Sequence, residues 1–202
     1  MKIKNIWKHF VTITKHKIAV FKNCIRAGLY WQGIVHDLSK YSPTEFFESV
    51  KYYQGTRSPI DACKEANNGI SMAWLHHKGR NKHHYEYWQD SFDKGTVHLQ
   101  MPFKYALELV CDYLAAGQVY SGKSFTLDGE LQWWYKKRDA GVAMDSKTKS
   151  FVTVMLENMA YEESYFSKQY GSSKARKMAY HWLNKKKAYT VWKECNSENS
   201  NE

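Results

Sequence analysis

The sequence predicts an all-α protein of seven or eight helices. Its 202 residues include only three prolines and eleven glycines, which leaves little of the turn chemistry that a many-stranded β protein needs. Apolar residues recur at helical spacing in several segments, and no set of segments reads as strands. A hydrophobic fraction of 43% and an aromatic fraction of 16% suit a thick helical core and exclude wholesale disorder.

The first two helices are predicted from side-chain spacing. A helix at 14–27 places three side chains on one stripe, at i, i+4 and i+8, and these are His16, Val20 and Cys24. A second helix is expected at about 29–38, where it ends in a His-Asp pair. Because His16 lies on the apolar stripe of its helix, we expect its imidazole to point inward.

Serine–proline pairs then mark two helix starts. At Ser42-Pro43-Thr44-Glu45, Ser42 is the predicted N-cap, the proline occupies the first position, and Glu45 closes a capping box. Ser58-Pro59 repeats the signal in weaker form. After an interruption at Asn67-Asn68-Gly69, a further helix is expected to run through His76-His77.

The chain is expected to form a helical core at residues 1–117, a helical extension at 118–195 packed on that core, and a frayed tail at 196–202. Pro102 begins the last helix of the core, and Gly117 is expected to end it. The extension contains two long amphipathic segments, at about 147–168 and 173–193.

Charge and composition limit the partners. Lysine and arginine total 30 against 20 aspartates and glutamates, a formal charge of +10 that is concentrated at 2–26, 136–138 and 185–187. A field of this sign attracts anions, so we expect an anionic small-molecule substrate such as a nucleotide, or nucleic acid. The alternative is a solvated surface that only keeps the protein in solution.

No targeting or membrane segment is recognised. No apolar run approaches the roughly 18 residues of a membrane span, and the first ten residues lack the apolar core of a signal peptide. We therefore expect a soluble, cytoplasmic protein with no membrane partner. The four cysteines lie far apart in the sequence, so we expect reduced thiols. The two terminal helices could also form a contact between subunits of an oligomer.

Histidines and aspartates form the main chemical signal. Five of the nine histidines fall between residues 36 and 84, in the pair His36-Asp37 and in the segment HHKGRNKHH at 76–84. Imidazole and carboxylate groups are the usual ligands of zinc, iron and manganese. Asp112 lies inside an apolar run, where a buried carboxylate needs a metal or another cation.

Each residue also has a structural explanation when taken alone. His16 could be a hydrogen-bonded core histidine, Asp112 could pair with a lysine or arginine, and HHKGRNKHH could be a basic anion-binding loop. The conjunction is harder to explain in that way, because four separate segments each direct a histidine or an aspartate inward. A metal site is therefore the favoured interpretation.

The order of these residues resembles the HD-domain metal-dependent phosphohydrolase superfamily. The resemblance covers about residues 10–117 and rests on His16, on His36-Asp37-Leu38-Ser39-Lys40, and on Asp112 within CDYLAA. The segments HDLSKYSPTEF, NKHHYEYW and LELVCDYLAA look more narrowly like a bacterial and phage family of HD-like proteins. The superfamily fold is all-α, which agrees with the helical reading.

The resemblance implies one or two divalent ions, of Mn, Fe, Zn, Co, Ni or Mg. It assigns the first metal to His16, His36, Asp37 and Asp112. A second would be held by His77 and His83, with His76 or His84 as the alternatives. Since consecutive helical residues point about 100° apart, only one member of each pair is expected to reach a given ion.

The implied reaction is hydrolysis of a phosphate ester, on a nucleotide or a similar small molecule. A divalent ion lowers the pKa of a bound water and offsets charge on phosphoryl oxygens. Asp37 would be both a ligand and a proton acceptor, and Lys40 would orient the phosphate or stabilise the leaving oxygen. Arg80 and Lys82 are candidates for the same substrate-binding role, with solvated side chains as the alternative.

Two other functional classes stay open. The first is a non-catalytic module in which a metal only stabilises a basic surface that binds nucleic acid or a protein partner. The second is redox or oxygenase chemistry at a two-iron centre on a related scaffold. Residues 117–124 formally fit the phosphate-binding P-loop pattern, but that motif needs a strand before it. A helix is expected there instead, so we reject the P-loop.

Overall fold

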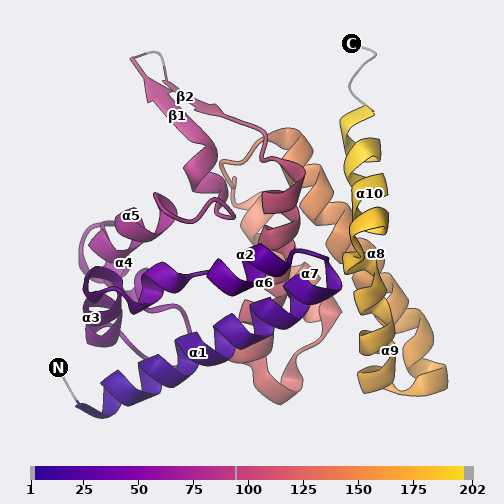
Figure 1. Cartoon of the computed structure of the whole chain (residues 1–202), viewed down its shortest axis with the longest axis horizontal. Coiled ribbons are helices and arrows are strands. Elements are labelled where there is room, and N and C mark those ends of the chain that lie inside the picture. Colours follow the sequence, from indigo (N-terminus) through magenta and orange to yellow (C-terminus); the bar gives the residue numbers. More distant parts are fainter. Residues whose placement is uncertain (1–2, 94, 198–202) are drawn as a thin grey trace.

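The computed structural model describes residues 3–93 and 95–197, and it confirms the all-α prediction (Figure 1). Ten α-helices lie within these ranges, joined by loops and short 3₁₀ turns. The helices are α1 (Ile3–Arg26), α2 (Tyr30–Val35), α3 (Pro43–Lys51), α4 (Pro59–Ala66), α5 (Met72–Lys78), α6 (Phe103–Ser121), α7 (Leu127–Asp139), α8 (Ser146–Tyr170), α9 (Ser172–Ala179) and α10 (Lys185–Ser197).

The central element is α6, which is buried on nearly all sides. Its residues from Ala106 to Ala115 are all buried, because α1 packs on one side of it and α8 on another. Asn23 of α1 is itself fully buried and donates its side-chain amide to the Cys111 carbonyl at 3.1 Å. This bond fixes α1 against α6, the two helices that carry His16 and Asp112.

The core is continuous from α1 to α10. One cluster of buried apolar side chains includes Val20 of α1, Leu114 of α6, Phe151 of α8 and Val191 of α10. In Figure 1, α8, α9 and α10 lie together on one side of the molecule, and α3, α4 and α5 lie on the other. The helix α10 extends to Ser197, and residues 198–202 of the expected tail lie outside the described residues.

Several features of the fold differ from the expectation, and the described ranges hold ten α-helices where seven or eight were predicted. The segment predicted as one helix at 173–193 is broken by a 3₁₀ turn at Tyr180–Leu183, and Asn184 begins α10 by accepting the Lys186 N–H at 3.0 Å. An antiparallel hairpin, β1 (Gln89–Phe92) and β2 (Gly95–His98), was not predicted. It is short and projects from the body (Figure 1), and none of the described side chains of β2 is buried, so alternation gives no signal.

The expected helix stop at Gly117 is wrong, because α6 continues to Ser121. This glycine is needed for space instead. A Cβ atom at position 117 would lie 1.9 Å from Glu130 Oε2 and 2.7 Å from a ring carbon of Phe125. The close approach of α7 to α6 therefore depends on the missing side chain.

Gly117→Ala should destabilise the protein even though alanine is the better helix former. The propensity gain is about 1 kcal/mol, whereas inserting a methyl group into a packed site costs about 1–3 kcal/mol. Urea denaturation of the parent and the variant measures the net loss. Adding Glu130→Ala should recover part of it, and a Gly117→Ala variant that is more stable than the parent would refute the packing argument.

No described helix combines the length and the apolar character that crossing a membrane requires.

Candidate metal centre

The candidate centre is built around a sharp turn at the end of α2. The helix stops at Val35, earlier than predicted, and His36 leaves the helical conformation, with φ −50° and ψ 127°. Asp37 then adopts the left-handed conformation, with φ 54° and ψ 24°. Aspartate and asparagine tolerate this region better than most residues, and such strained positions cluster at functional sites. The turn is held by Lys17 of α1, which donates to the carbonyls of Ile34 and His36 at 2.7 and 2.8 Å.

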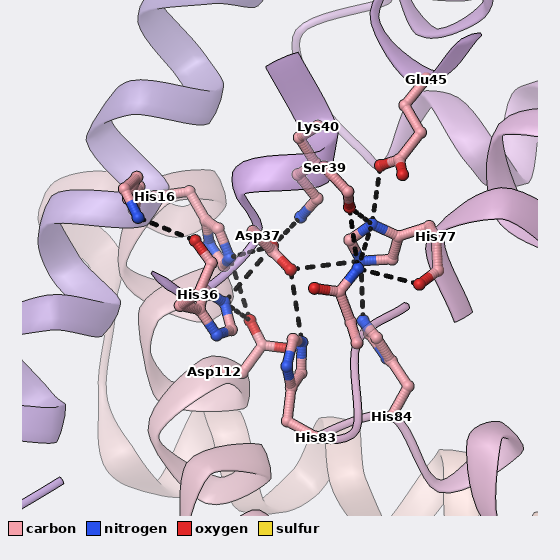
Figure 2. A network of polar contacts seen from close by, with 12 residues as sticks. His16, His36, Asp37, Ser39, Lys40, Glu45, His77, His83, His84 and Asp112 are labelled. Carbon is pink, nitrogen blue, oxygen red and sulfur yellow. Dashed lines mark hydrogen bonds and ion pairs between the residues drawn. The ribbon is translucent and has the colours of Figure 1, made fainter. Parts of the chain in front are cut away.

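The four residues expected at the first metal do come together (Figure 2). His16 Nε2 lies 3.0 Å from Asp112 Oδ1 and 3.5 Å from Asp37 Oδ2. His36 Nε2 lies 3.3 Å from the same Asp37 oxygen and 3.6 Å from Asp112 Oδ1. Two ligand atoms about 2.1 Å from one ion and at right angles are about 3 Å apart, so this spacing suits a shared ion. All four residues are buried. We call them the first ligand group.

A second ligand group lies on the other side of Asp37 and contains Asp37, His77, His83 and His84. Asp37 Oδ1 lies 3.3 Å from His77 Nε2 and 3.4 Å from His83 Nε2. His84 Nε2 lies 2.9 Å from His77 Nε2. Figure 2 shows His77 and His83 directed at the Asp37 carboxylate, as are His16 and His36 of the first group, whereas His84 contacts His77.

The expectation that only one of His83 and His84 would reach this position is wrong. That expectation assumed helical geometry, whereas α5 ends at Lys78 and the segment after it is a turn. His84 is extended, with φ −82° and ψ 127°, so neighbouring side chains need not diverge by 100°. His76 lies outside both groups, since its Nδ1 contacts Glu45 at 2.6 Å.

Two glutamates behind the histidines were missed by the sequence analysis. Glu108 Oε1 lies 2.9 Å from His36 Nδ1 and 3.3 Å from His83 Nδ1, and Glu45 Oε2 lies 2.7 Å from His77 Nδ1. A carboxylate can only accept, so His36 and His77 donate their Nδ1 protons, and the Nε2 atom of each ring is the one that faces Asp37. Metal-binding histidines are usually oriented in this way.

His36, His83 and Glu108 also lie within metal-binding distance of one another. We assign Glu108 to hydrogen bonding, because it meets the Nδ1 atoms and not the Nε2 atoms that converge on Asp37. The predicted role of Glu45 was also wrong. It was expected to close a capping box, but Ser42 makes no side-chain cap and the Glu45 carboxylate binds histidines instead.

The polar atoms of the cluster fit a cation. Nε2 of His16, His36 and His83 is buried and makes no hydrogen bond within residues 3–93 and 95–197. Burial disfavours charge on His36, yet the nearby carboxylates, Asp37 foremost, raise its pKa well above the usual value. Burial also opposes charge on Asp37, but His36 and the other cations around it hold the pKa of that carboxyl well below its usual range. The carboxylates of the cluster therefore favour a bound cation.

The predicted substrate-binding residues lie in different places. Lys40 Nζ is 2.5 Å from Asp37 Oδ2, and the Lys40 side chain is 31% exposed, so it lies between the cluster and solvent. Arg80 and Lys82 are exposed and border a cavity of about 360 Å³ on the Glu108 side of the histidines. Arg80 reaches the His76 carbonyl and Lys82 lies over the Tyr87 ring; among the contacts of the described residues, neither pairs with Asp37.

The rejection of the P-loop is confirmed. Residues Gly122–Ser124 form a 3₁₀ turn, and the segment before them is α6 and not a strand. The first condition of that motif is therefore absent from this part of the described chain.

Glu45→Gln should weaken metal binding without unfolding the protein. The amide cannot accept from His76 and His77 together as the carboxylate does, so His77 loses the charge that orients it. Removing such an outer partner typically lowers metal affinity about 10–100-fold. Competition of the parent and the variant with a chromophoric zinc chelator measures the change. The matched control is Glu157→Gln, because Glu157 binds Tyr135 and lies in neither group. Equal affinity in all three proteins would show that Glu45 does not support the site.

Fold and site together define an all-α protein with a buried cluster of histidines and carboxylates at metal-binding distances. The chain belongs to a family described as of unknown function, DUF5662, whose model matches residues 5–158. The matched segment includes every residue of both ligand groups. No curated protein matches the chain. No solved structure matches it.

Proposed function

We propose that the protein is a metal-dependent phosphohydrolase of the HD type, which hydrolyses the phosphate ester of a nucleotide or of a similar small molecule. One observation supports this above the others. The two oxygens of Asp37 face different sets of imidazoles, His16 and His36 on one side and His77 and His83 on the other. An aspartate in that position is suited to bridge two divalent ions.

The donor atoms narrow the choice of metal. The first ligand group offers two imidazoles and two carboxylates, and the second offers three imidazoles and one carboxylate. Imidazole ligands favour Fe, Co, Ni or Zn, and the carboxylates of the first group also suit Mn, whereas Mg prefers a set made of oxygen ligands. Bound here, such an ion would supply a water of lowered pKa and would offset charge on a phosphoryl oxygen.

The residues around the ligands have separate roles. Burial opposes the charge of Lys40, but Asp37 and Asp112 outweigh it and raise the pKa of the lysine, so Lys40 stays protonated. It therefore acts by its charge, orienting a phosphate or stabilising the leaving oxygen, and does not transfer a proton. Asp37 would itself be a ligand in both groups and would serve as the proton acceptor. Glu108 and Glu45 keep the histidine Nε2 atoms directed at the centre.

The test is elemental analysis of the purified, untagged protein beside His36→Ala and Asp112→Ala, followed by a phosphoester screen with Mn, Fe and Zn. We expect near-stoichiometric metal and metal-dependent turnover in the parent, and loss of both in the two variants. His181→Ala is the control, since His181 pairs with Glu162 away from the cluster. A parent that binds no metal after reconstitution would overturn the proposal.

The same experiment separates the alternative classes. A parent that binds metal and nucleic acid but turns over no phosphoester would support the non-catalytic basic module. Oxygen consumption by the iron-loaded protein would support redox chemistry. The phosphohydrolase is favoured because Lys40 places a fixed positive charge beside Asp37, where a phosphate would lie.

A further inference from the structure

A second cavity lies between α6 and α7, away from the ligand groups. It has a volume of about 380 Å³ and is bordered by Gly117 and Tyr120 of α6, by Glu130 and Trp133 of α7, and by Arg57 and Asp61. We call it the α6–α7 cavity. None of its lining residues belongs to either ligand group, so its chemistry is separate from metal binding.

The carboxyl group of Glu130 is the most unusual part of this cavity. Glu130 is only 7% exposed, and its carboxyl group makes no hydrogen bond or ion pair within the described ranges, whereas its backbone N–H donates to the Thr126 carbonyl. It is pressed against the backbone at Gly117, which leaves room for it by having no side chain. Burial, assisted by the charge of Asp112, raises the pKa of Glu130 to about 8, so the group is mainly neutral at pH 7. A neutral carboxyl presents a donor and an acceptor side by side.

Aromatic rings form the walls of the cavity. Trp133 is 44% exposed and Tyr120 is 40% exposed, so both have ring surface available to a ligand. Trp133 packs edge-on against Tyr113 with centroids 5.1 Å apart, and Lys137 Nζ lies 5.3 Å from the Trp133 ring and 5.0 Å from the Tyr113 ring. These contacts fix the orientation of Trp133. A rigid aromatic wall is suited to stacking against a flat ring.

The cavity is not built for an anion. Arg57 contributes a guanidinium to the lining, but both of its terminal nitrogens already bind Glu65, at 2.5 and 2.6 Å. Asp61 and Glu130 add carboxyl groups to the wall. A phosphate is therefore disfavoured here, whereas a neutral group with hydrogen-bonding edges is not.

The cavity and the first ligand group are connected along one helix. One face of α6 carries Asp112 and, four and eight residues later, two cavity-lining residues, Ala116 and Tyr120. At the helical rise per residue, Ala116 lies about 6 Å and Tyr120 about 12 Å along the axis from Asp112. A small phosphate ester can span that interval. Its phosphate would lie at the ligand groups and its organic part in the cavity.

We propose that the α6–α7 cavity binds the flat, uncharged heterocycle of the substrate, with Trp133 stacking on the ring and Glu130 hydrogen-bonding an edge that carries a donor next to an acceptor. Nucleobases are the common biological rings with such an edge. The inference rests on the proposed function for the position of the phosphate, but the binding of the ring does not require turnover.

The experiment measures ring binding and catalysis separately. Isothermal titration calorimetry with four ribonucleosides tests the cavity, and turnover of nucleoside 5′-monophosphates against ribose 5-phosphate tests its use. The variants are Trp133→Leu, Glu130→Leu and Glu130→Gln. Trp7→Leu is the control, because Trp7 is 68% exposed on α1 and is not part of the cavity lining.

We expect Trp133→Leu and Glu130→Leu to weaken nucleoside binding about 10-fold or more, which is the usual effect of a lost base stack or a lost paired edge. Glu130→Gln keeps a donor and an acceptor and should bind like the parent, as should Trp7→Leu. In the turnover assay, the two leucine variants should have a raised KM for nucleoside 5′-monophosphates and an unchanged KM for ribose 5-phosphate.

The outcomes distinguish this inference from the proposed function. Nucleosides that fail to bind, or that bind Glu130→Leu as tightly as the parent, would overturn the inference even if phosphoesters are hydrolysed. Nucleoside binding that depends on Trp133 and Glu130, in a protein that hydrolyses no phosphoester, would overturn the proposed function and keep the cavity as a ring-binding site.

Discussion

Asp37→Asn should weaken metal binding at both ligand groups at once and reduce the proposed phosphoester turnover to background. Each oxygen of Asp37 faces a different set of imidazoles, and asparagine replaces one of them with an NH₂ group that cannot coordinate a cation and leaves the other as an uncharged amide oxygen. One ligand group therefore loses a ligand, and the other loses the negative charge of its ligand. The loss of affinity should exceed the 10–100-fold that follows removal of an outer-shell partner. Because asparagine tolerates the left-handed backbone at this position, the variant should keep its fold.

Inductively coupled plasma mass spectrometry and circular dichroism together check this prediction. The matched control is Asp90→Asn, since Asp90 is exposed on β1 and lies in neither ligand group. It should retain the metal content and turnover of the parent. An Asp37→Asn protein that is folded and still holds one equivalent of metal would show that one ligand group forms without Asp37.

Glu130→Gln should stabilise the protein, and more so at pH 8 than at pH 5. The pKa of Glu130 is about 8 in the fold against an ordinary value of 4.5, so above pH 4.5 the unfolded chain ionises while the folded chain keeps its proton. The folded state then binds more protons than the unfolded state, and the parent loses stability as the pH rises from 4.5 through 8. Glutamine does not titrate. At about 1.4 kcal/mol per pH unit, the advantage of the variant should grow by up to roughly 4 kcal/mol between pH 5 and pH 8.

Urea denaturation at the two pH values measures this difference. Glu194→Gln on α10 is the control, because Glu194 is exposed and its replacement should give the same difference from the parent at both pH values. If the advantage of Glu130→Gln were also the same at pH 5 and pH 8, the carboxyl at position 130 would be ionised in the fold. The hydrogen-bonding role proposed for it would then have to be that of an acceptor alone.

The sequence was a good guide to which helices form and to the first ligand group. His16 lies on the inward stripe of α1 as its spacing predicted, and Asp112 lies within a helix whose central residues are all buried. Both predictions follow from helical periodicity, which survives folding when one face must be buried. The boundaries were less predictable, because Gly117 can end a helix or admit a neighbouring side chain, and only tertiary packing decides between them.

The residues that the sequence analysis missed had competing local explanations. Glu45 stands three residues after a serine, which is also the spacing of a capping box, and only the approach of α5 to α3 directs it to His77. Glu108 had a usable signal, since it precedes Asp112 by four residues and so shares its helix face. His84 was expected only as an alternative to His83 because helical geometry was assumed, although Gly79 and Asn81 in the same segment favour a turn.

The wide spacing of the ligands along the chain has a consequence for folding kinetics. His16 and Asp112 are separated by almost half of the chain, and the adjacent pairs His36-Asp37 and His83-His84 are the shortest-range combinations in the two groups. An unfolded chain would therefore offer an ion little chelation, and the groups form only after α1, α5 and α6 have assembled. An ion that binds this late cannot nucleate folding. It would instead slow unfolding, so that metal loading lengthens the lifetime of the native state and leaves the rate of refolding nearly unchanged.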